Sequence, residues 1–194
     1  MIQIRDNVFE TNSSSTHSLC ISKEKFDPKN IPDYLNITAD EDFGWSRDTY
    51  STAEEKANYI FEVMSKCGLM AEIKDFKNKI KKLGIKASYP RLIKDKWGDI
   101  AISGDVDHAG EVIPFIHELL KDEDKLCRFL FDYKSVIYTG SDCVDDSDAS
   151  CYVAEAAENN GYTWGQDENG EWNETHHIHP MYDPDHYEYF FKGN

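Results

Sequence analysis

Two amphipathic helices in tandem set the strongest limit on how this chain can fold. Apolar side chains recur at helical spacing in 52–67 and again in 70–83, and a glycine follows each run, at Gly68 and Gly84. The first run opens on Thr52–Glu55, a capping box whose side chains satisfy free backbone N–H groups. We therefore expect two adjacent helices, each with an apolar stripe turned toward a shared core.

Strand patterns flank this helical middle on both sides. Apolar and polar residues alternate in 2–10, a short strand is predicted at 19–22, and 135–139 has the composition of a buried strand. Two more helices are expected at 110–121 and 124–131. Together these elements predict an α+β fold with N-terminal strands, a helical middle and a β-rich, acidic C-terminal part.

The C-terminal part differs from the rest in charge and composition. From residue 140 onward there are 13 Asp or Glu residues and one basic residue, in a chain whose net charge is −16. Asn169-Gly170 is typical of a hairpin turn, and 186–191 has the pattern of a final edge strand. We therefore divide the chain into an α+β core domain, 1–139, and an acidic, aromatic-rich subdomain or appendage, 140–194.

The charge also bears on the class of partner. Such an excess of carboxylates repels phosphate backbones and favours basic proteins or cations, so direct nucleic-acid binding is not expected. The five cysteines form no CxxC pair, and Met1–Asp6 lacks the basic-then-apolar order of a secretion signal. No apolar run reaches the roughly 18–20 residues that span a bilayer. We therefore expect a cytoplasmic protein with reduced thiols and no contact with a membrane.

The N-terminal string carries a resemblance. The run from Arg5 to Ser18, RDNVFETNSSSTHS, resembles the opening of a family of small uncharacterised proteins from low-GC bacteria and their phages. The likeness extends to Phe43-Gly-Trp45, to Asp107-His108 and to 129–140, and it covers about the first three quarters of the chain. It implies an origin in mobile elements and their hosts, and it brings no activity with it.

The hydroxyl-rich run Thr11–Ser18 is the first candidate site. Small hydroxyl side chains and exposed amides bind anionic oxygens, and His17 among them has the chemistry of a general base or proton carrier. The run has no glycine, no P-loop lysine and no nucleophile elbow, so a solvated turn is the alternative. The candidate ligand-binding residues are Ser13, Ser14, Ser15, Thr16 and Ser18.

A second constellation is Asp105-Val-Asp107-His108, which is followed by Glu111 and His117. Adjacent Asp and His side chains bind a divalent metal in phosphohydrolases, which makes Asp107 and His108 candidate catalytic residues beside His17. The alternative is a helix start, because carboxylates are favoured at helix N-termini.

Four of the seven histidines gather near the C-terminus. On a strand, His177 and His179 would point to one side, and Asp183 or Asp185 would complete a His/carboxylate set for a transition metal. A divalent metal is therefore the one cofactor that the sequence suggests. Two prolines in the same segment favour the alternative of an irregular, solvent-exposed stretch.

Carboxylates alternate with aromatic side chains throughout the acidic part. Aromatic rings supply anchoring area, and carboxylates around them suit the basic groove of a nucleic-acid-binding protein. A solvated hairpin with an aromatic core is the alternative. The candidate partner-binding residues are Asp142, Asp145, Asp146, Asp148, Trp164 and Trp172.

Two function hypotheses follow. The first is an acidic, non-enzymatic inhibitor, an anti-CRISPR-like nucleic-acid mimic whose basic partner is a bacterial defence nuclease or another nucleic-acid-handling protein. The second is a metal-dependent phosphoester hydrolase or nucleotide-binding protein that uses the Ser/Thr-His run and the Asp-His pair. The second hypothesis requires His17 to lie close to Asp107 or His108. The first requires an exposed field of carboxylates and no buried cleft.

Overall fold

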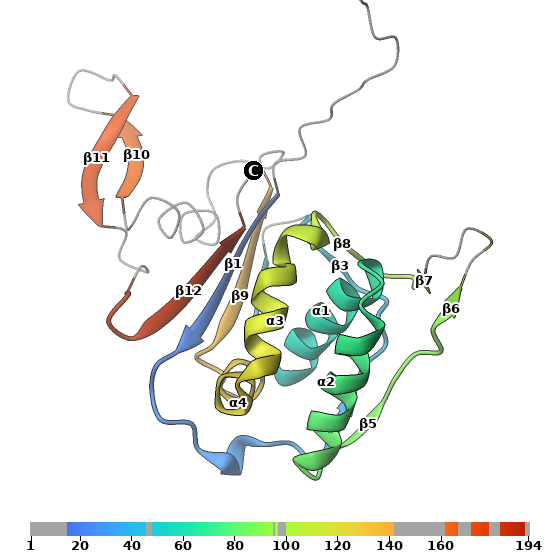
Figure 1. The fold of residues 1–194 in the computed structure, drawn as a ribbon. Helices are drawn as coiled ribbons and strands as arrows, with labels where there is room; N and C mark the ends of the chain where they lie inside the picture. Colours follow the sequence, from blue (N-terminus) through green and yellow to red (C-terminus); the bar gives the residue numbers. More distant parts are fainter. Residues whose placement is uncertain are drawn as a thin grey trace, which may run out of the picture.

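The computed structural model describes residues 15–45, 48–94, 96, 100–141, 162–166, 172–178 and 183–192. Within them, side chains are described except at Thr16, Ser141, 162–166, 172–178 and 191–192. This part of the chain forms two layers, a four-stranded antiparallel sheet and four helices that lie on one of its faces (Figure 1).

The sheet is built from strands that come from both ends of the described chain. Its order is β12-β1-β9-β4, and each neighbouring pair is antiparallel. β12 brings the end of the predicted 140–194 segment into the same sheet as β1, while the boundary at 139 stays a prediction. The strands are Ser15–Ser22 (β1), Asp48–Tyr50 (β4), Val136–Ser141 (β9) and Tyr187–Lys192 (β12).

Helix α1 lies at the centre of the helical layer. It begins at the predicted capping box, in which the Glu55 N–H donates to the Thr52 hydroxyl at 3.3 Å and the Thr52 N–H donates to the Glu55 carboxylate at 2.9 Å. Because α1 contacts each of the other helices, all of its residues from 56 to 65 are buried. The helices are Ala53–Lys66 (α1), Met70–Lys82 (α2), Ile113–Lys121 (α3) and Glu123–Phe131 (α4).

The hydrophobic core fills the space between the helices and the sheet. Phe76 on α2 is fully buried, and Phe115 on α3 meets Phe129 on α4 edge to face with ring centroids 5.2 Å apart. Leu19 and Ile137 close the core from the sheet side. Each large apolar side chain buried here contributes roughly 1.5–3 kcal/mol to folding.

A buried lysine joins the end of α4 to the start of β9. The Lys56 ammonium donates to the carbonyl oxygens of Asp132 at 2.8 Å and Ser135 at 2.6 Å. Burial lowers the pKa of Lys56 to about 8. The two carbonyl contacts satisfy this ammonium, which explains how the core accommodates it.

Short elements complete the described fold. β2 pairs with β5 and β3 pairs with β8 in parallel, whereas β6 with β7 and β10 with β11 are antiparallel. Their bounds, with those of two 3₁₀ turns, are Pro28–Asn30 (η1), Tyr34–Asn36 (β2), Asp42–Phe43 (β3), Lys86–Ser88 (β5), Ile93–Lys94 (β6), Ile100–Ala101 (β7), Asp105–Val106 (β8), Ala109–Val112 (η2), Tyr162–Gln166 (β10) and Trp172–Ile178 (β11).

The predicted α+β fold class is confirmed, with its helices in the middle of the chain. One local prediction is wrong: the strand expected at 19–22 begins at Ser15, so Ser15–Ser18 is the first half of β1 and not part of a solvated turn. Hydrogen bonding to β9 and β12 supplies backbone partners whatever the polarity of the side chains, so the strand starts earlier than its apolar residues suggest. The strand predicted at 2–10 lies outside the described residues.

Among the helices that the structure describes, none combines the length and the apolar character needed to cross a bilayer.

Candidate active site

Segments that are distant in the sequence meet around His17, which lies near the start of β1. That end of β1 is uppermost in Figure 1. Thr139 on β9 lies directly opposite His17, and Asp48 on β4 lies opposite Thr139. Because paired residues of neighbouring strands point to the same face, these three side chains form a row on the face that α1 covers.

Tyr59 of α1 orients the His17 ring. His17 is fully buried, and its Nδ1 lies 2.7 Å from the Tyr59 hydroxyl oxygen. Burial raises the pKa of Tyr59 well above its ordinary value, so this side chain remains a phenol at neutral pH. Since Nδ1 faces Tyr59, Nε2 is the ring nitrogen that faces the neighbouring loop.

The main chain of Gly44 lies directly against Nε2. A Cβ atom on Gly44 would stand 2.5 Å from His17 Nε2 and 3.0 Å from Cε1, so no side chain fits here without moving the imidazole. The φ of +92° also favours glycine. Asp107 flanks the same point, because its own Cβ would lie 3.3 Å from that atom. His17 and Asp107 therefore converge on Gly44.

The pairing of β3 with β8 brings the Asp107-His108 step to this place. The Asp107 N–H donates to the Phe43 carbonyl at 3.0 Å. His108 follows with a φ of +52°, a left-handed conformation that non-glycine residues rarely adopt. Its exposed ring places Nδ1 3.0 Å from a Glu111 carboxylate oxygen and Nε2 3.8 Å from an Asp107 carboxylate oxygen.

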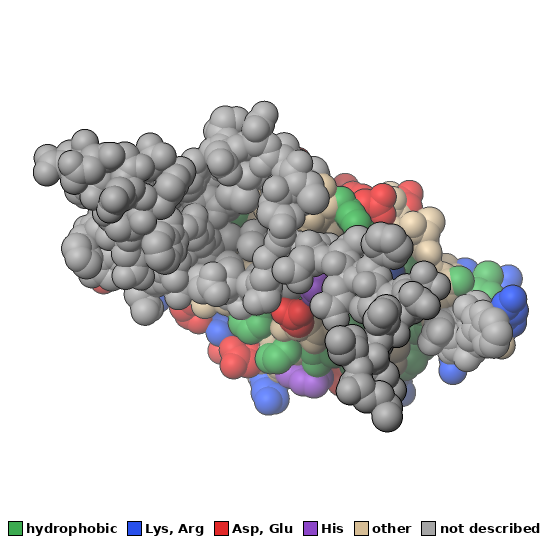
Figure 2. All heavy atoms as spheres, turned by 90° about the horizontal axis from the view of Figure 1, so that it is seen from above, with side chains coloured by type: hydrophobic (Ala, Val, Ile, Leu, Met, Phe, Trp, Pro, Cys, Tyr) green, Lys and Arg blue, Asp and Glu red, His purple; other side chains and the backbone are tan. Residues whose placement is uncertain are grey.

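Aromatic rings support one side of this arrangement. Phe43 packs edge to face against Tyr50 at 4.8 Å and Tyr59 at 5.2 Å between ring centroids. The Tyr50 hydroxyl donates to Asp48 at 3.4 Å, and burial, followed by the nearby Asp48 charge, raises the pKa of Tyr50. Seen from this end, acidic side chains lie beside histidine on the described surface (Figure 2). We call the set His17, Gly44, Asp48, Tyr59, Asp107 and Thr139 the His17 cluster.

The structure brings some of the predicted site residues together and separates others. His17 and Asp107 meet in the cluster, His108 is adjacent and exposed, and Ser15 is buried at the start of β1. Ser18 does not belong with them, because strand side chains alternate and its hydroxyl turns to the opposite face, 3.7 Å from the Cys20 sulfur. Ser13, Ser14 and the Thr16 side chain lie outside what is described.

The predicted metal and partner sets lie mostly outside the described side chains. This holds for Asp142, Asp145, Asp146, Asp148 and His179, while Trp164, Trp172 and His177 are described by their backbone on β10 and β11. Asp183 accepts a hydrogen bond from His186 Nδ1 at 2.8 Å, and Asp185 is exposed. The described side chains contain no group of three His, Cys, Asp or Glu suited to a metal ion. Both sets stay predictions.

Four residues of the His17 cluster were not expected from the sequence. Tyr59 belongs to the apolar run that predicts a helix over 52–67, and Asp48 and Thr139 enter the cluster only through strand pairing. Gly44 had a signal, since Phe43-Gly-Trp45 is one of the segments that the resemblance shares. No protein-family model, curated protein or solved structure matches the chain, so its chemistry is inferred from the cluster alone.

Proposed function

We propose that this chain is a phosphoester-handling protein, a hydrolase or nucleotide binder, whose site is the His17 cluster. The observation that carries the proposal is the convergence of His17 and Asp107 on Gly44. An acidic inhibitor has no need for this contact, whereas a site that uses the Ser/Thr-His run and the Asp-His pair depends on it.

The carboxylates of the cluster determine whether a phosphoester would bind as the free anion or as its Mg²⁺ complex. Asp48 and Asp107 repel a bare phosphate, so a phosphoester is expected to enter as its Mg²⁺ complex. Mg²⁺ is commonly held by one or two carboxylates together with substrate phosphates and several waters. Asp107, beside Gly44 and His17, and Asp48, two strands from His17 in the same row, are the carboxylates that would hold it.

His17 supplies the proton-transfer chemistry in this proposal. With Nδ1 held by the Tyr59 phenol, Nε2 is the atom that takes a proton from an attacking water or gives one to a leaving oxygen. His17 is fully buried with Gly44 against Nε2, whereas the Asp107 side chain is 13% exposed. A ligand would therefore meet Asp107 first, and the proposal requires the Gly44 segment to move aside before the ligand reaches Nε2. The competing interpretation is a structural His–Tyr hydrogen bond in the core.

A binding experiment separates these interpretations. Purified protein is heated with nucleoside mono-, di- and triphosphates and p-nitrophenyl phosphate, each with Mg²⁺ and again with EDTA. At least one compound should raise Tm with Mg²⁺ alone, because a ligand that binds only the folded state stabilises it. Asp107→Asn should remove that rise and leave the ligand-free Tm close to wild type. The control Asp75→Asn alters an exposed carboxylate on α2. Absence of any Mg²⁺-dependent rise, or an unchanged rise in Asp107→Asn, would contradict the proposal.

A second candidate, the acidic inhibitor, is favoured by the distribution of charge. Residues 140–194 hold 13 of the 37 acidic residues and one of the 21 basic ones. In the described part, burial and then the nearby charges of Glu55, Asp40 and Glu54 raise the pKa of Glu41, which indicates that carboxylates crowd there too. Such a surface would act on a basic, nucleic-acid-handling protein mainly by speeding association.

The inhibitor hypothesis has its own test. Neutralising Asp142, Asp145, Asp146 and Asp148 together should slow association with a basic nuclease, and salt should weaken that binding steeply, since exposed charges are screened over about 8–10 Å at physiological ionic strength. Added DNA or RNA should compete for the same nuclease surface. Tight binding of this chain to nucleic acid, or full inhibition by the neutralised variant, would overturn it.

A further inference from the structure

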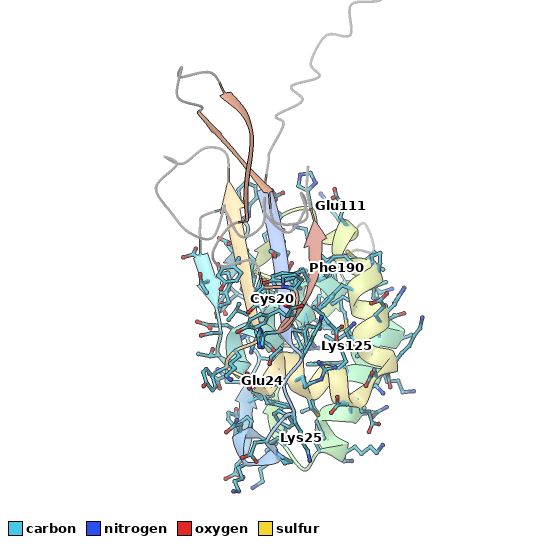
Figure 3. All side chains as sticks on the ribbon, turned by 90° about the vertical axis from the view of Figure 1, so that its left-hand side faces the viewer. Cys20, Glu24, Lys25, Glu111, Lys125 and Phe190 are labelled. Atoms are coloured by element: carbon cyan, nitrogen blue, oxygen red, sulfur yellow. The ribbon has the colours of Figure 1, made fainter. Side chains whose placement is uncertain are left out.

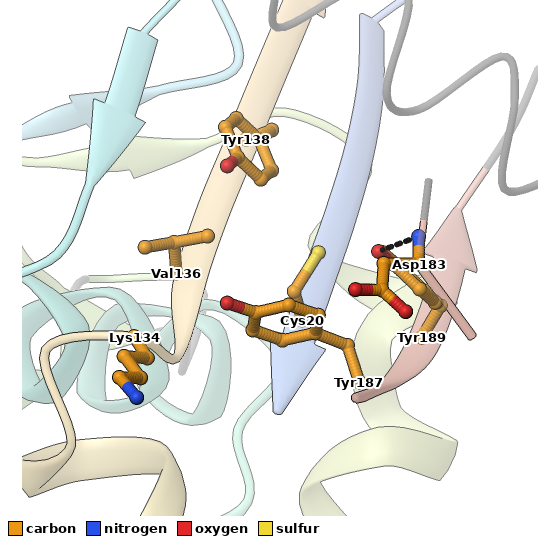
Figure 4. A pocket seen from close by; sticks show the side chains of 7 residues that line it. All are labelled: Cys20, Lys134, Val136, Tyr138, Asp183, Tyr187 and Tyr189. Carbon is orange, nitrogen blue, oxygen red and sulfur yellow. Dashed lines mark hydrogen bonds between the residues drawn. The ribbon is translucent and has the colours of Figure 1, made fainter. Parts of the chain in front are cut away.

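A pocket of about 260 Å³ opens on the outer face of the sheet, opposite the helices (Figure 4). It spans β9, β1 and β12, and its position is separate from the His17 cluster, which lies on the helix-covered face. Cys20 lies between Val136 and Tyr189 in the strand register and forms the floor; in a view onto this face it lies over the strand layer (Figure 3). The lining residues are Cys20, Lys134, Val136, Tyr138, Asp183, Tyr187 and Tyr189.

Side-chain size creates this hollow. The outward residues of the central strand are small, and Ser18, Cys20 and Ser22 are all 1% exposed or less, although none of the described helices covers this face. The flanking strands place Tyr138 opposite Ser18 and Tyr187 opposite Ser22. Large aromatic side chains on the flanking strands and small side chains on β1 leave a trough between them. The strand register determines which residues stand opposite one another.

The tyrosines line the pocket as neutral phenols. Burial raises the pKa of Tyr138 to about 12 and raises that of Tyr189 as well, so neither ring carries a charge at neutral pH. The Asp183 N–H donates to the Tyr189 hydroxyl at 3.0 Å, which ties the turn before β12 to the rim. The rings of Tyr187 and Tyr189 are 6.2 Å apart and tilted by 52°. Aromatic faces arranged in this way attract cations.

Two carboxylates have partners at this pocket, one through Lys134 of the lining and the other as a lining residue. Glu24 pairs with Lys134 at 2.6 Å, a pair whose charges cancel at any pH near neutrality. Asp183 instead pairs with His186 at 2.8 Å, and the hydrogen bond to Asp183 raises the pKa of His186. Asp183 is the carboxylate that lines the pocket itself.

Other charged groups near His186 either raise its pKa as well or are already hydrogen-bonded to the main chain. The charges of Asp185 and Glu24 also raise the pKa of His186. Lys23, the nearby cation on the adjoining segment, donates its ammonium to the Pro184 carbonyl at 2.5 Å. Lys134 also lines the pocket, and its ammonium is paired with Glu24. A cation would therefore meet ring faces, Asp183 and a lysine whose charge Glu24 offsets, in a chain whose net charge of −16 disfavours anions.

We propose that this pocket binds an organic cation, an alkylammonium or guanidinium group, between the faces of Tyr138, Tyr187 and Tyr189 and the Asp183 carboxylate. The site is independent of the proposed phosphoester function. The cation is either a free small molecule or the end of a lysine or arginine side chain on a protein, because both present the same group.

The test is an NMR titration of the full chain, followed at the backbone amides of Cys20, Tyr138 and Tyr189. The probes are propylammonium, propylguanidinium, indole as a neutral ring and butyrate as an anion. The cations should bind more tightly than indole or butyrate, because ring faces and a carboxylate both attract positive charge. Cations that bind no better than indole or butyrate would overturn the proposal.

Substitutions locate the binding groups. Asp183→Asn should raise the Kd of propylguanidinium about fivefold, and Tyr187→Leu should weaken binding by a similar factor. Tyr187→Phe keeps the ring face and should bind like wild type, as should Tyr34→Leu, which alters an exposed tyrosine on β2. Wild-type binding by both Asp183→Asn and Tyr187→Leu would contradict the assignment.

A further binding comparison with peptides distinguishes the two sources of the cation. A pentapeptide with a central arginine is compared with its glutamine counterpart and with free propylguanidinium. Tighter binding of the arginine peptide assigns the pocket to a side chain of a protein partner, and equal binding assigns it to a free cation. Equal binding of the glutamine peptide would overturn the role of the charge.

Discussion

The apolar interior and the His17 cluster both rest on α1, yet different physical constraints specify them. In the interior, Phe76, Phe115 and Phe129 fill volume, and side chains of similar size can replace one another at modest cost. In the cluster, one close contact fixes each group, as with His17 and the Tyr59 hydroxyl at 2.7 Å. The stability of the interior therefore depends on how much side-chain volume a substitution removes. The geometry of the cluster, in contrast, is disturbed by any atom that a substitution adds.

Truncating the interior should have the largest effect. Phe76→Ala should lower the free energy of unfolding by about 3–5 kcal/mol, because it removes a fully buried ring and leaves a cavity between α2 and its neighbours. Urea denaturation measures this, with Lys74→Ala as a control at an exposed position of the same helix. A loss below about 1 kcal/mol would mean that α2 does not seal the core.

Adding one methyl group should be costly in the cluster. Gly44→Ala should lower the free energy of unfolding by roughly 1–3 kcal/mol, since Gly44 has positive φ and the new Cβ would stand 2.5 Å from His17 Nε2. Gly84→Ala is the matched control, with a φ of +81° and nothing within 4 Å of the added atom. The difference between the variants isolates the contact with His17. Equal losses would show that the imidazole moves aside freely.

The sequence predicts the interior far better than the cluster. Helical spacing marks Ile60, Val63 and Phe76 as core residues, because a repeating apolar face has one physical explanation. The approach of Gly44 to His17 depends on a parallel pairing between β3 and β8, two-residue strands too short to leave any period in the sequence. The extension of β1 back to Ser15, which the polar composition hides, then turns Ser18 away from His17, because successive side chains of a strand alternate between faces.

The sequence does not predict that polar side chains of α1 are buried, for a related reason. Asn58 accepts the Thr38 N–H at 2.9 Å and Glu62 accepts the Glu41 N–H at 3.2 Å, so both satisfy an irregular segment that runs past the helix. On a surface helix, residues of these types would face solvent. Their burial follows from the loop that packs there, which has no signature of its own.

The buried carboxyl group of Glu62 should make the free energy of unfolding depend on pH. Burial, followed in effect by nearby carboxylates, raises the pKa of Glu62 from 4.5 to about 8. The folded chain then holds a proton that the unfolded chain loses, so the free energy of unfolding should fall, by roughly 1–3 kcal/mol, as pH rises through this window. Glu62→Gln should flatten the fall, because the amide does not ionise, and its oxygen can still accept the Glu41 N–H.

Chemical denaturation across this pH range measures the effect, with the exposed Glu118→Gln as control. Lys56 does not interfere, because its lowered pKa of about 8 affects stability only at higher pH, where the free energy of unfolding should rise as pH rises toward 10.5. A Glu62→Gln variant with the same pH profile as wild type would show that this carboxyl ionises freely in the folded state.

The most direct measurement of the central claim is the NMR spectrum of the His17 imidazole during titration with the Mg²⁺ complexes of nucleotides. If the His17 cluster is the phosphoester site, binding should shift the His17 Nε2 signal in wild type, and Asp107→Asn should abolish both the shift and the binding. The ring signals of His117, exposed on α3, serve as the internal reference. A nucleotide that binds while the His17 signals stay fixed would place the site elsewhere and leave His17 as a core residue held by Tyr59.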